Sequence, residues 1–96
     1  MKCECPEGLE QVDLRARLFP QSWKNAAIRE LYDAKLGGVQ CAQCLAVFSG
    51  NAGLRALQGD HIVPWSRGGQ TTWLNLQLLC KPCNLAKLNT LSETFI

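Results

Sequence analysis

The short segments CAQC (residues 41–44) and CKPC (residues 80–83) decide how this chain folds. With two residues between them, the cysteines of a pair can turn both sulfurs toward one point, and two such pairs complete a tetrahedral shell. A shell of four sulfurs suits zinc and leaves no open coordination position. The sequence therefore predicts a structural zinc ion on Cys41, Cys44, Cys80 and Cys83. Two disulfides and unligated buried thiols are the alternatives.

A metal site agrees with the length of the chain and with its expected compartment. The 96 residues form one domain, and so short a chain buries only about 60–65% of its unfolded surface, so a bound metal adds needed stability. No apolar run approaches the roughly 20 residues of a membrane span, and the first residues lack the apolar segment of a secretory signal. We therefore expect a reducing cytoplasm and no membrane partner. Paired cysteines in that compartment more often hold metal than form disulfides.

The 35 residues between the two pairs (residues 45–79) are more than a compact zinc finger needs, so they are expected to fold. Residues 54–63 (LRALQGDHIV) are expected to lead into one strand and residues 75–80 (NLQLLC) to form a second, with the loop 64–73 between them. A final helix then begins at KPCN, where Pro82 suits the first turn. Its expected packing face consists of Leu85, Leu88 and either Leu91 or Ser92.

Residues 1–40 are expected to form an N-terminal helical extension that packs on a core of residues 41–96. The main helix of this extension would begin with Ser22 as its N-cap and end at the glycine pair at 37–38. Its apolar stripe would consist of Trp23, Ala27, Ile28, Leu31 and, at its end, Ala34.

The only histidine of the chain, His61, lies in the segment GDHIVPW (59–65). It can be a packed core residue, a metal ligand or a catalytic group. Asp60 precedes it at the end of a predicted strand, and Asn84 directly follows Cys83 at the start of the last helix. A single zinc on both cysteine pairs would hold that helix beside the strand, so that Asp60 and Asn84 could present oxygen atoms to one point. Oxygen ligands with room for water and phosphate suit Mg²⁺ or Mn²⁺ rather than zinc.

The same arrangement suits a phosphate. Asn84 lies at the positive end of a helix, and Lys87, three residues on, shares its side of that helix. Adjacent strand residues point to opposite faces, so Asp60 and His61 cannot both face the helix in a regular strand. A twisted strand end could place a metal and an imidazole on opposite sides of one phosphorus. In-line attack needs that arrangement, with the histidine deprotonating water and the metal stabilising the leaving oxygen. With an ordinary pKa of about 6.5, histidine is a suitable base at neutral pH.

These residues together resemble the HNH endonucleases. The match runs from Cys41 to Lys87, about half of the chain, and keeps the family's order: DHIVP, the glycine pair of the loop, NL at the second strand, and CKPCNLAK. The resemblance implies an α+β fold with a small ββα-metal core similar to a treble clef, here stapled by a four-cysteine zinc. It also implies metal-dependent hydrolysis of phosphodiester bonds in nucleic acid.

The resemblance further implies roles for single residues. Asp60 resembles the first metal ligand, His61 the general base, and Asn75 the asparagine that braces the loop carrying the histidine. Asn84 stands where the family name expects a final histidine, which makes the motif H-N-N. Its amide oxygen can bind Mg²⁺ or Mn²⁺. Binding of softer transition metals at this site becomes less favourable.

The positive charge of the chain lies in the half with the cysteine pairs. Residues 41–96 carry four basic and two acidic side chains, whereas basic and acidic residues cancel in residues 1–40. This excess is compatible with phosphate contacts by Lys87, Arg67 and Lys81, although the last two are equally well explained as solvated charges. Double-stranded DNA is the default substrate. Site specificity is expected to be low, or to be supplied by a homodimer or a larger protein partner.

A non-catalytic zinc module that binds nucleic acid or a protein partner is the second function that the sequence allows. The intact Asp60–His61 pair argues against it. A redox switch through the cysteine pairs explains neither that pair nor Asn84.

Four further residues receive structural interpretations. Trp65 and Trp73 flank the loop and are expected to anchor it by packing, with base stacking as the alternative. Cys3 and Cys5 are expected to be free thiols, with a weak metal contact or an intermolecular link as alternatives.

Overall fold

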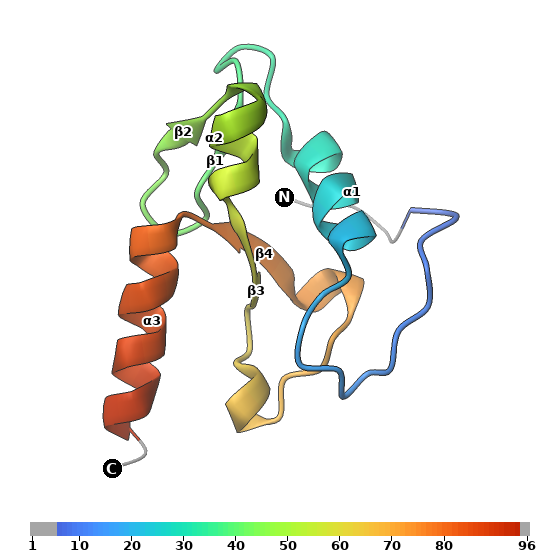
Figure 1. The fold of residues 1–96 in the computed structure, drawn as a ribbon, viewed down its shortest axis with the longest axis vertical. Coiled ribbons are helices and arrows are strands. Elements are labelled where there is room, and N and C mark those ends of the chain that lie inside the picture. The colour runs from blue at the N-terminus through green and yellow to red at the C-terminus, as the bar shows by residue number, and fades with distance from the viewer. Residues whose placement is uncertain (1–5, 95–96) are drawn as a thin grey trace.

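The computed structural model describes residues 6–94, and the side chains of residues 6–88, in an α+β fold (Figure 1). Its helices and strands are α1 (Gln21–Leu31), β1 (Val39–Gln40), β2 (Val47–Phe48), α2 (Gly50–Ala56), β3 (Gln58–His61), β4 (Leu76–Leu79) and α3 (Lys81–Thr94), with 3-10 turns η1 (Trp65–Arg67) and η2 (Trp73–Asn75) before β4. Cys3 and Cys5 lie outside the described residues. The predicted packing position at Leu91 or Ser92 lies outside the described side chains. Among the described residues, no helix combines the length and the apolarity needed to cross a membrane.

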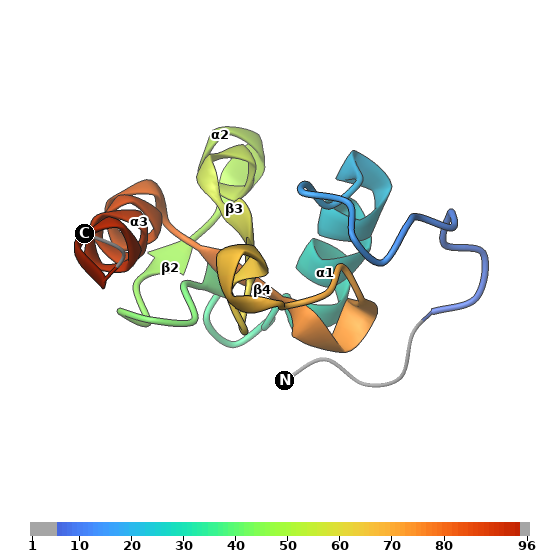
Figure 2. The same ribbon diagram turned by 90° about the horizontal axis from the view of Figure 1, so that it is seen from below.

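Two antiparallel strand pairs organise the chain. β1 pairs with β2, and β3 pairs with β4, which places Asp60 opposite Gln77 and His61 opposite Leu76. Helices α1 and α3 lie on opposite sides of the β3–β4 hairpin (Figures 1 and 2); α1 contacts β4, and α3 contacts β3. Two strands and a helix with four cysteines at their junction make the zinc-stapled ββα architecture, so the predicted fold class is confirmed.

The hydrophobic core lies between α1 and the β3–β4 hairpin. Leu76 and Leu78 of β4 are both buried. They point to the same face, as residues two apart in a strand do. Their buried partners are Trp23, Ala26, Ala27, Val39, Leu57 and Trp73. Full burial of a leucine side chain contributes about 1.5–3 kcal/mol, so this cluster holds α1 firmly on the hairpin. Trp73 belongs to it and anchors the loop by packing, as expected.

Helix α1 is shorter than predicted, because it ends at Leu31 and does not continue to the glycine pair. Asp33 ends it: its Oδ1 accepts hydrogen bonds from the backbone N–H groups of Lys35 (2.8 Å) and Leu36 (3.3 Å). Local bonds of this kind from an aspartate side chain favour a turn over a continued helix.

The start of α1 also differs from the prediction that Ser22 is the N-cap. Pro20 occupies that position, and its carbonyl accepts hydrogen bonds from the N–H groups of Trp23 and Lys24. Ser22 lies inside the helix, where its hydroxyl donates to the carboxylate of Glu10. The bond to Glu10 joins segments too far apart in the chain for a local capping pattern to reveal it.

Residues 54–63 lead into a strand as predicted, because β3 begins at Gln58. The helical turn at their start was not predicted, since residues 54–56 end the short helix α2. Leu54 packs against the core from this helix. A short apolar run has no period that separates a buried helical turn from a strand, so the sequence could not reveal this turn.

The predicted packing face of α3 is wrong for its two described members, since Leu85 and Leu88 are 49% and 47% exposed. The helix instead turns Cys83, Asn84 and Lys87, all partly buried, toward the hairpin. Cys83 must reach the other three sulfurs, and this requirement sets the rotation of the helix about its axis.

Candidate metal centre and catalytic cleft

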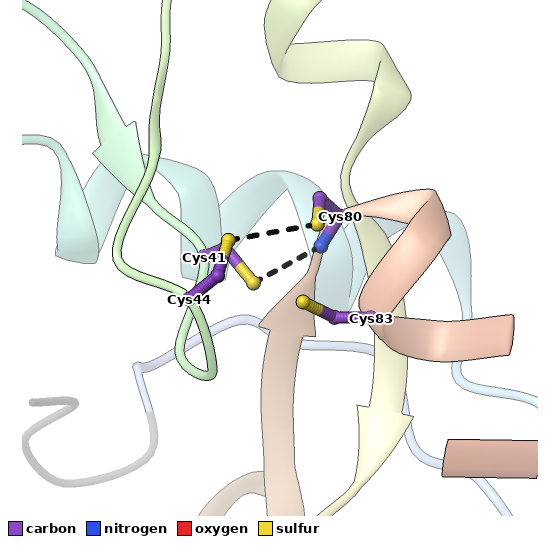
Figure 3. Close-up of side chains that lie close together, drawn as sticks. All are labelled: Cys41, Cys44, Cys80 and Cys83. Atoms are coloured by element: carbon purple, nitrogen blue, oxygen red, sulfur yellow. Dashed lines mark hydrogen bonds between the residues drawn. The ribbon is translucent and has the colours of Figure 1, made fainter. Parts of the chain in front are cut away.

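Four cysteine sulfurs gather where the two strand pairs meet α3 (Figure 3). All four sulfurs lie within 4.8 Å of one another, and those of Cys44 and Cys80 are 3.8 Å apart. A tetrahedral zinc with Zn–S bonds of about 2.3 Å separates its ligands by roughly this distance. All four are free cysteines, which excludes the two disulfides. The cluster is positioned to bind a metal ion, and its four sulfurs support a structural zinc.

Two of these thiols, Cys41 and Cys83, have pKa values shifted in opposite directions. Burial raises the pKa of Cys41, but backbone N–H groups, led by those of Cys44 and Cys80, stabilise the thiolate and lower its pKa to about 6. The N–H of Cys80 lies 3.3 Å from the Cys41 sulfur. The hydrogen bond with Cys80, desolvation and the neighbouring sulfurs raise the pKa of Cys83 to about 12. The Cys41 thiolate therefore forms readily, whereas the Cys83 thiolate needs a neighbouring cation to stabilise it.

A cleft of about 230 Å³ lies beside this centre, between β3, α3 and the segment that precedes α1. Four residues that the sequence singled out line it: Asp60, His61, Asn84 and Lys87. Two other predicted contacts, Arg67 and Lys81, are exposed and are not among its lining residues.

The carboxylate of Asp60 is surrounded by hydrogen-bond donors. The ammonium of Lys87 lies 2.5 Å from its Oδ2, and Nε2 of Gln77 donates to the same oxygen at 2.8 Å. Nδ2 of Asn84 lies 3.4 Å from Oδ1. Asp60 and Asn84 are therefore close together, as their positions on β3 and α3 suggested. Gln77 was missed, although it lies opposite Asp60 in the hairpin register.

The imidazole of His61 is held in an enclosed position, with the residue only 8% exposed. Its ring centroid lies 4.3 Å from that of Phe19, and its Nε2 lies 2.8 Å from Oγ1 of Thr71. Burial lowers the pKa of His61 below its ordinary 6.5, and the nearby carboxylate of Asp60 opposes this shift only in part. The imidazole is therefore uncharged at neutral pH, the state in which it can accept a proton.

Residues 41–90 match the family model described as HNH endonuclease. The matched segment is just over half of the chain and contains the four cysteines, both strands of the hairpin and the first turns of α3. This chain belongs to the HNH endonuclease family. No curated protein and no solved structure gave a match. Membership in the HNH family indicates a nuclease-type function.

In this HNH chain, Asn75 lies outside the cleft lining and binds the backbone of the loop. Its Oδ1 accepts the N–H of Val63 at 2.8 Å, and its Nδ2 donates to the carbonyls of Val63 (3.1 Å) and Gln70 (2.8 Å). Gly69 makes the same loop compact, because a Cβ at that position would lie 1.7 Å from the carbonyl oxygen of Val63. The loop that follows His61 is therefore closed on itself.

The segment before α1 forms one wall of the HNH cleft, which the sequence did not reveal. The guanidinium of Arg17 lies 4.9 Å from the ring centroid of Trp65, and both residues line the cleft. The indole N–H of Trp65 donates to the carbonyl of Arg15 at 3.0 Å. Since this segment has no regular secondary structure, its two arginines were the only available signal.

Proposed function

We propose that this HNH protein is a metal-dependent endonuclease that hydrolyses phosphodiester bonds of DNA. The observation that carries the proposal is the shared cleft, where an uncharged imidazole lies next to a carboxylate and a cationic side chain in a chain of an endonuclease family. A module that only binds nucleic acid has no need of a neutral, partly desolvated histidine in its binding surface.

The residues of the cleft divide the reaction between them. His61 takes a proton from a water molecule, whose oxygen forms the new bond to phosphorus. The bond from phosphorus to the 3′ oxygen breaks, and the departing oxygen takes up a proton from solvent. Lys87 and Arg17, cations that line the cleft, bind phosphate oxygens. Asn75 keeps the loop after His61 closed.

Asp60 and Asn84 would hold the divalent ion. Their polar atoms lie 3.4 Å apart on β3 and α3, and rotation of the Asn84 amide about its last torsion exchanges its nitrogen for its oxygen. A carboxylate and an amide oxygen form a hard donor set that fits Mg²⁺ or Mn²⁺. When bound, the ion would supply stabilisation of negative charge on the phosphate and the departing oxygen.

Double-stranded DNA is the substrate that we propose, with exposed Arg67 and Lys81 touching phosphates beyond the cleft. One cleft can cut one strand, so the expected product is a nick. Cutting of both strands would require a homodimer or a larger protein partner that brings a second site.

A non-catalytic zinc module that binds nucleic acid or a protein partner is the second candidate. The observation that favours it is the contact between Lys87 and Asp60, because the ammonium neutralises the carboxylate without any divalent ion.

Supercoiled plasmid and the zinc-loaded protein separate the two candidates. Cleavage is measured with Mg²⁺, with Mn²⁺ and with a chelator at a concentration that leaves the zinc in place, as checked by metal analysis. Binding to a duplex is measured in parallel by fluorescence anisotropy, with Asp60→Asn as the matched variant. The endonuclease nicks the plasmid only with added metal, and Asp60→Asn binds the duplex without nicking. Binding by the wild type with no nicking under any metal would favour the non-catalytic module.

A further inference from the structure

We propose that Thr71 is a positioning residue for His61: its hydroxyl, held by the carbonyl of Ala16, accepts the Nε2 proton of the imidazole and keeps Nδ1 as the proton-accepting atom. The inference rests on the proposed function of His61 as the base. It adds two groups to the site, one of them from a segment outside the part of the chain that matches the HNH family.

The directions of two consecutive hydrogen bonds carry the argument. Oγ1 of Thr71 lies 2.5 Å from the carbonyl oxygen of Ala16. A carbonyl oxygen can only accept, so the hydroxyl proton of Thr71 must lie in that bond. Oγ1 then meets Nε2 of His61, 2.8 Å away, as an acceptor. Nε2 therefore carries the proton, and since a neutral imidazole has one N–H, the lone pair of the ring is on Nδ1.

The nitrogen that this arrangement leaves without a proton, Nδ1, is accessible to solvent. Within residues 6–88, every buried side-chain nitrogen or oxygen has a hydrogen-bond partner. The ring of His61 bonds to a described residue through Nε2 and not through Nδ1, so Nδ1 is not a buried atom. Nδ1 is consequently accessible to solvent, and His61 lines the cleft. The nitrogen with the lone pair is the one that can meet an attacking water.

Thr71 is itself fixed, so it can hold the ring in one orientation. Its side chain is fully buried, and its backbone N–H donates to the carbonyl of Leu14 at 2.8 Å. The N–H of Ala16 donates to the carbonyl of Asp13 at 2.9 Å, which closes the turn that presents the Ala16 carbonyl. Phe19 packs against the ring of His61. The segment of residues 13–19 therefore acts on the imidazole in two ways. The carbonyl of Ala16 orients the Thr71 hydroxyl that binds the ring, and Phe19 packs against the ring directly.

Nitrogen NMR of the zinc-loaded 96-residue chain tests the wild-type arrangement directly. The chain has one histidine, so labelling histidine with ¹⁵N gives one pair of ring signals. At a pH where the ring is neutral, we expect the chemical shift of a protonated nitrogen for Nε2 and of an unprotonated nitrogen for Nδ1. A protonated Nδ1 would overturn the proposal. The spectrum needs no cleavage activity, so failure of the nuclease proposal and failure of this one are told apart.

Two variants of Thr71 separate positioning from mere structure. Thr71→Val keeps the shape and removes the hydroxyl, so both ring nitrogens should become partly protonated and kcat for plasmid nicking should fall on the order of 10- to 100-fold with KM unchanged. Thr71→Ser keeps the hydroxyl and should restore the spectrum and the rate. Thr72→Val is the matched control, because the hydroxyl of Thr72 makes no capping bond to η2.

Outcomes against the proposal are equally specific. An unchanged spectrum and an unchanged rate in Thr71→Val would overturn it. The same holds if Thr71→Ser, with normal zinc content, shows the tautomer mixture expected of the valine variant. If Thr71→Val does not fold, the wild-type spectrum and the serine variant still decide.

Discussion

The ammonium of Lys87 lies 2.5 Å from Oδ2 of Asp60 and 2.6 Å from the carbonyl oxygen of His61. One side chain of α3 therefore binds two consecutive residues of β3, at the point where the strand enters the cleft. This contact holds the helix and the strand in register. It also sets a positive charge beside the carboxylate that we propose as a ligand for a divalent ion.

Lys87→Met should raise the affinity of the protein for Mn²⁺ and lower the cleavage rate. Removal of the ammonium ends its repulsion of the ion, worth about 1.4 kcal/mol or a tenfold change in the dissociation constant, while the phosphate loses a cationic contact. Calorimetric titration with Mn²⁺ measures the first effect. Lys81→Met, at the exposed start of the same helix, should leave the Mn²⁺ affinity unchanged. An equal Mn²⁺ affinity in wild type and Lys87→Met would contradict a metal site at Asp60.

Cys83→Ser should remove the zinc and most of the folded protein. Structural zinc sites of this kind supply on the order of 10–16 kcal/mol of apparent binding energy, which acts as folding energy. We expect about one zinc per wild-type chain and almost none in the variant, with a large fall in Tm, by metal analysis and thermal unfolding. A variant with both Cys3 and Cys5 changed to serine should keep its zinc. Full zinc content in Cys83→Ser would refute the four-sulfur site.

The lowered pKa of His61 predicts how stability changes with acid. Well above pH 6.5, the ordinary pKa, neither the folded nor the unfolded chain protonates the ring, and the free energy of unfolding is unaffected. As the pH falls through 6.5, the unfolded chain takes up a proton that the folded chain does not, so stability falls until the folded pKa is reached.

Urea unfolding from about pH 8 to about pH 5 measures this loss. His61→Gln, which cannot titrate, is the matched variant, because acid weakens the zinc site equally in both proteins. The wild type should lose more stability than His61→Gln below pH 6.5. Parallel curves for the two proteins would show that burial does not disfavour the charged ring.

Gly69→Ala should disrupt the loop that follows His61. Its Cβ would lie 1.7 Å from the carbonyl oxygen of Val63, so the backbone that Asn75 holds must move. We expect a loss of about 1–3 kcal/mol in the free energy of unfolding and a lower nicking rate. Gly53→Ala, in α2, should be tolerated, because the added Cβ would meet only Phe48, at ordinary distances of 3.6 Å or more. Equal stability of both variants would contradict the loop geometry.

Part of the fold could be predicted from the sequence because its signals are local. The cysteine spacing predicts the metal cluster from the reach of neighbouring side chains, and the position of Pro82 predicts the start of α3. The turn at Asp33 and the helix α2 could not be predicted, because each depends on choices between conformations of similar energy. The inward face of α3 follows from the position of Cys83 in the cluster, which outweighs the apolar pattern of Leu85 and Leu88.

The candidate site shows the same division. Asp60, His61 and Asn84 could be grouped in advance, because the strand and the helix that carry them are tied together by the cysteines. The contact between Thr71 and Ala16 joins residues 55 positions apart, and no pattern in an irregular segment predicts such a pairing. Arg17 escaped notice for the same reason.

Plasmid nicking by His61→Ala beside the wild type tests the nuclease proposal most directly. Both proteins are purified identically, shown to carry equal zinc, and assayed with Mg²⁺, with Mn²⁺ and without added metal. We predict metal-dependent nicking by the wild type and its loss in His61→Ala, whose fold and zinc content remain. Equal nicking by the two proteins would contradict the assignment of His61 as the base.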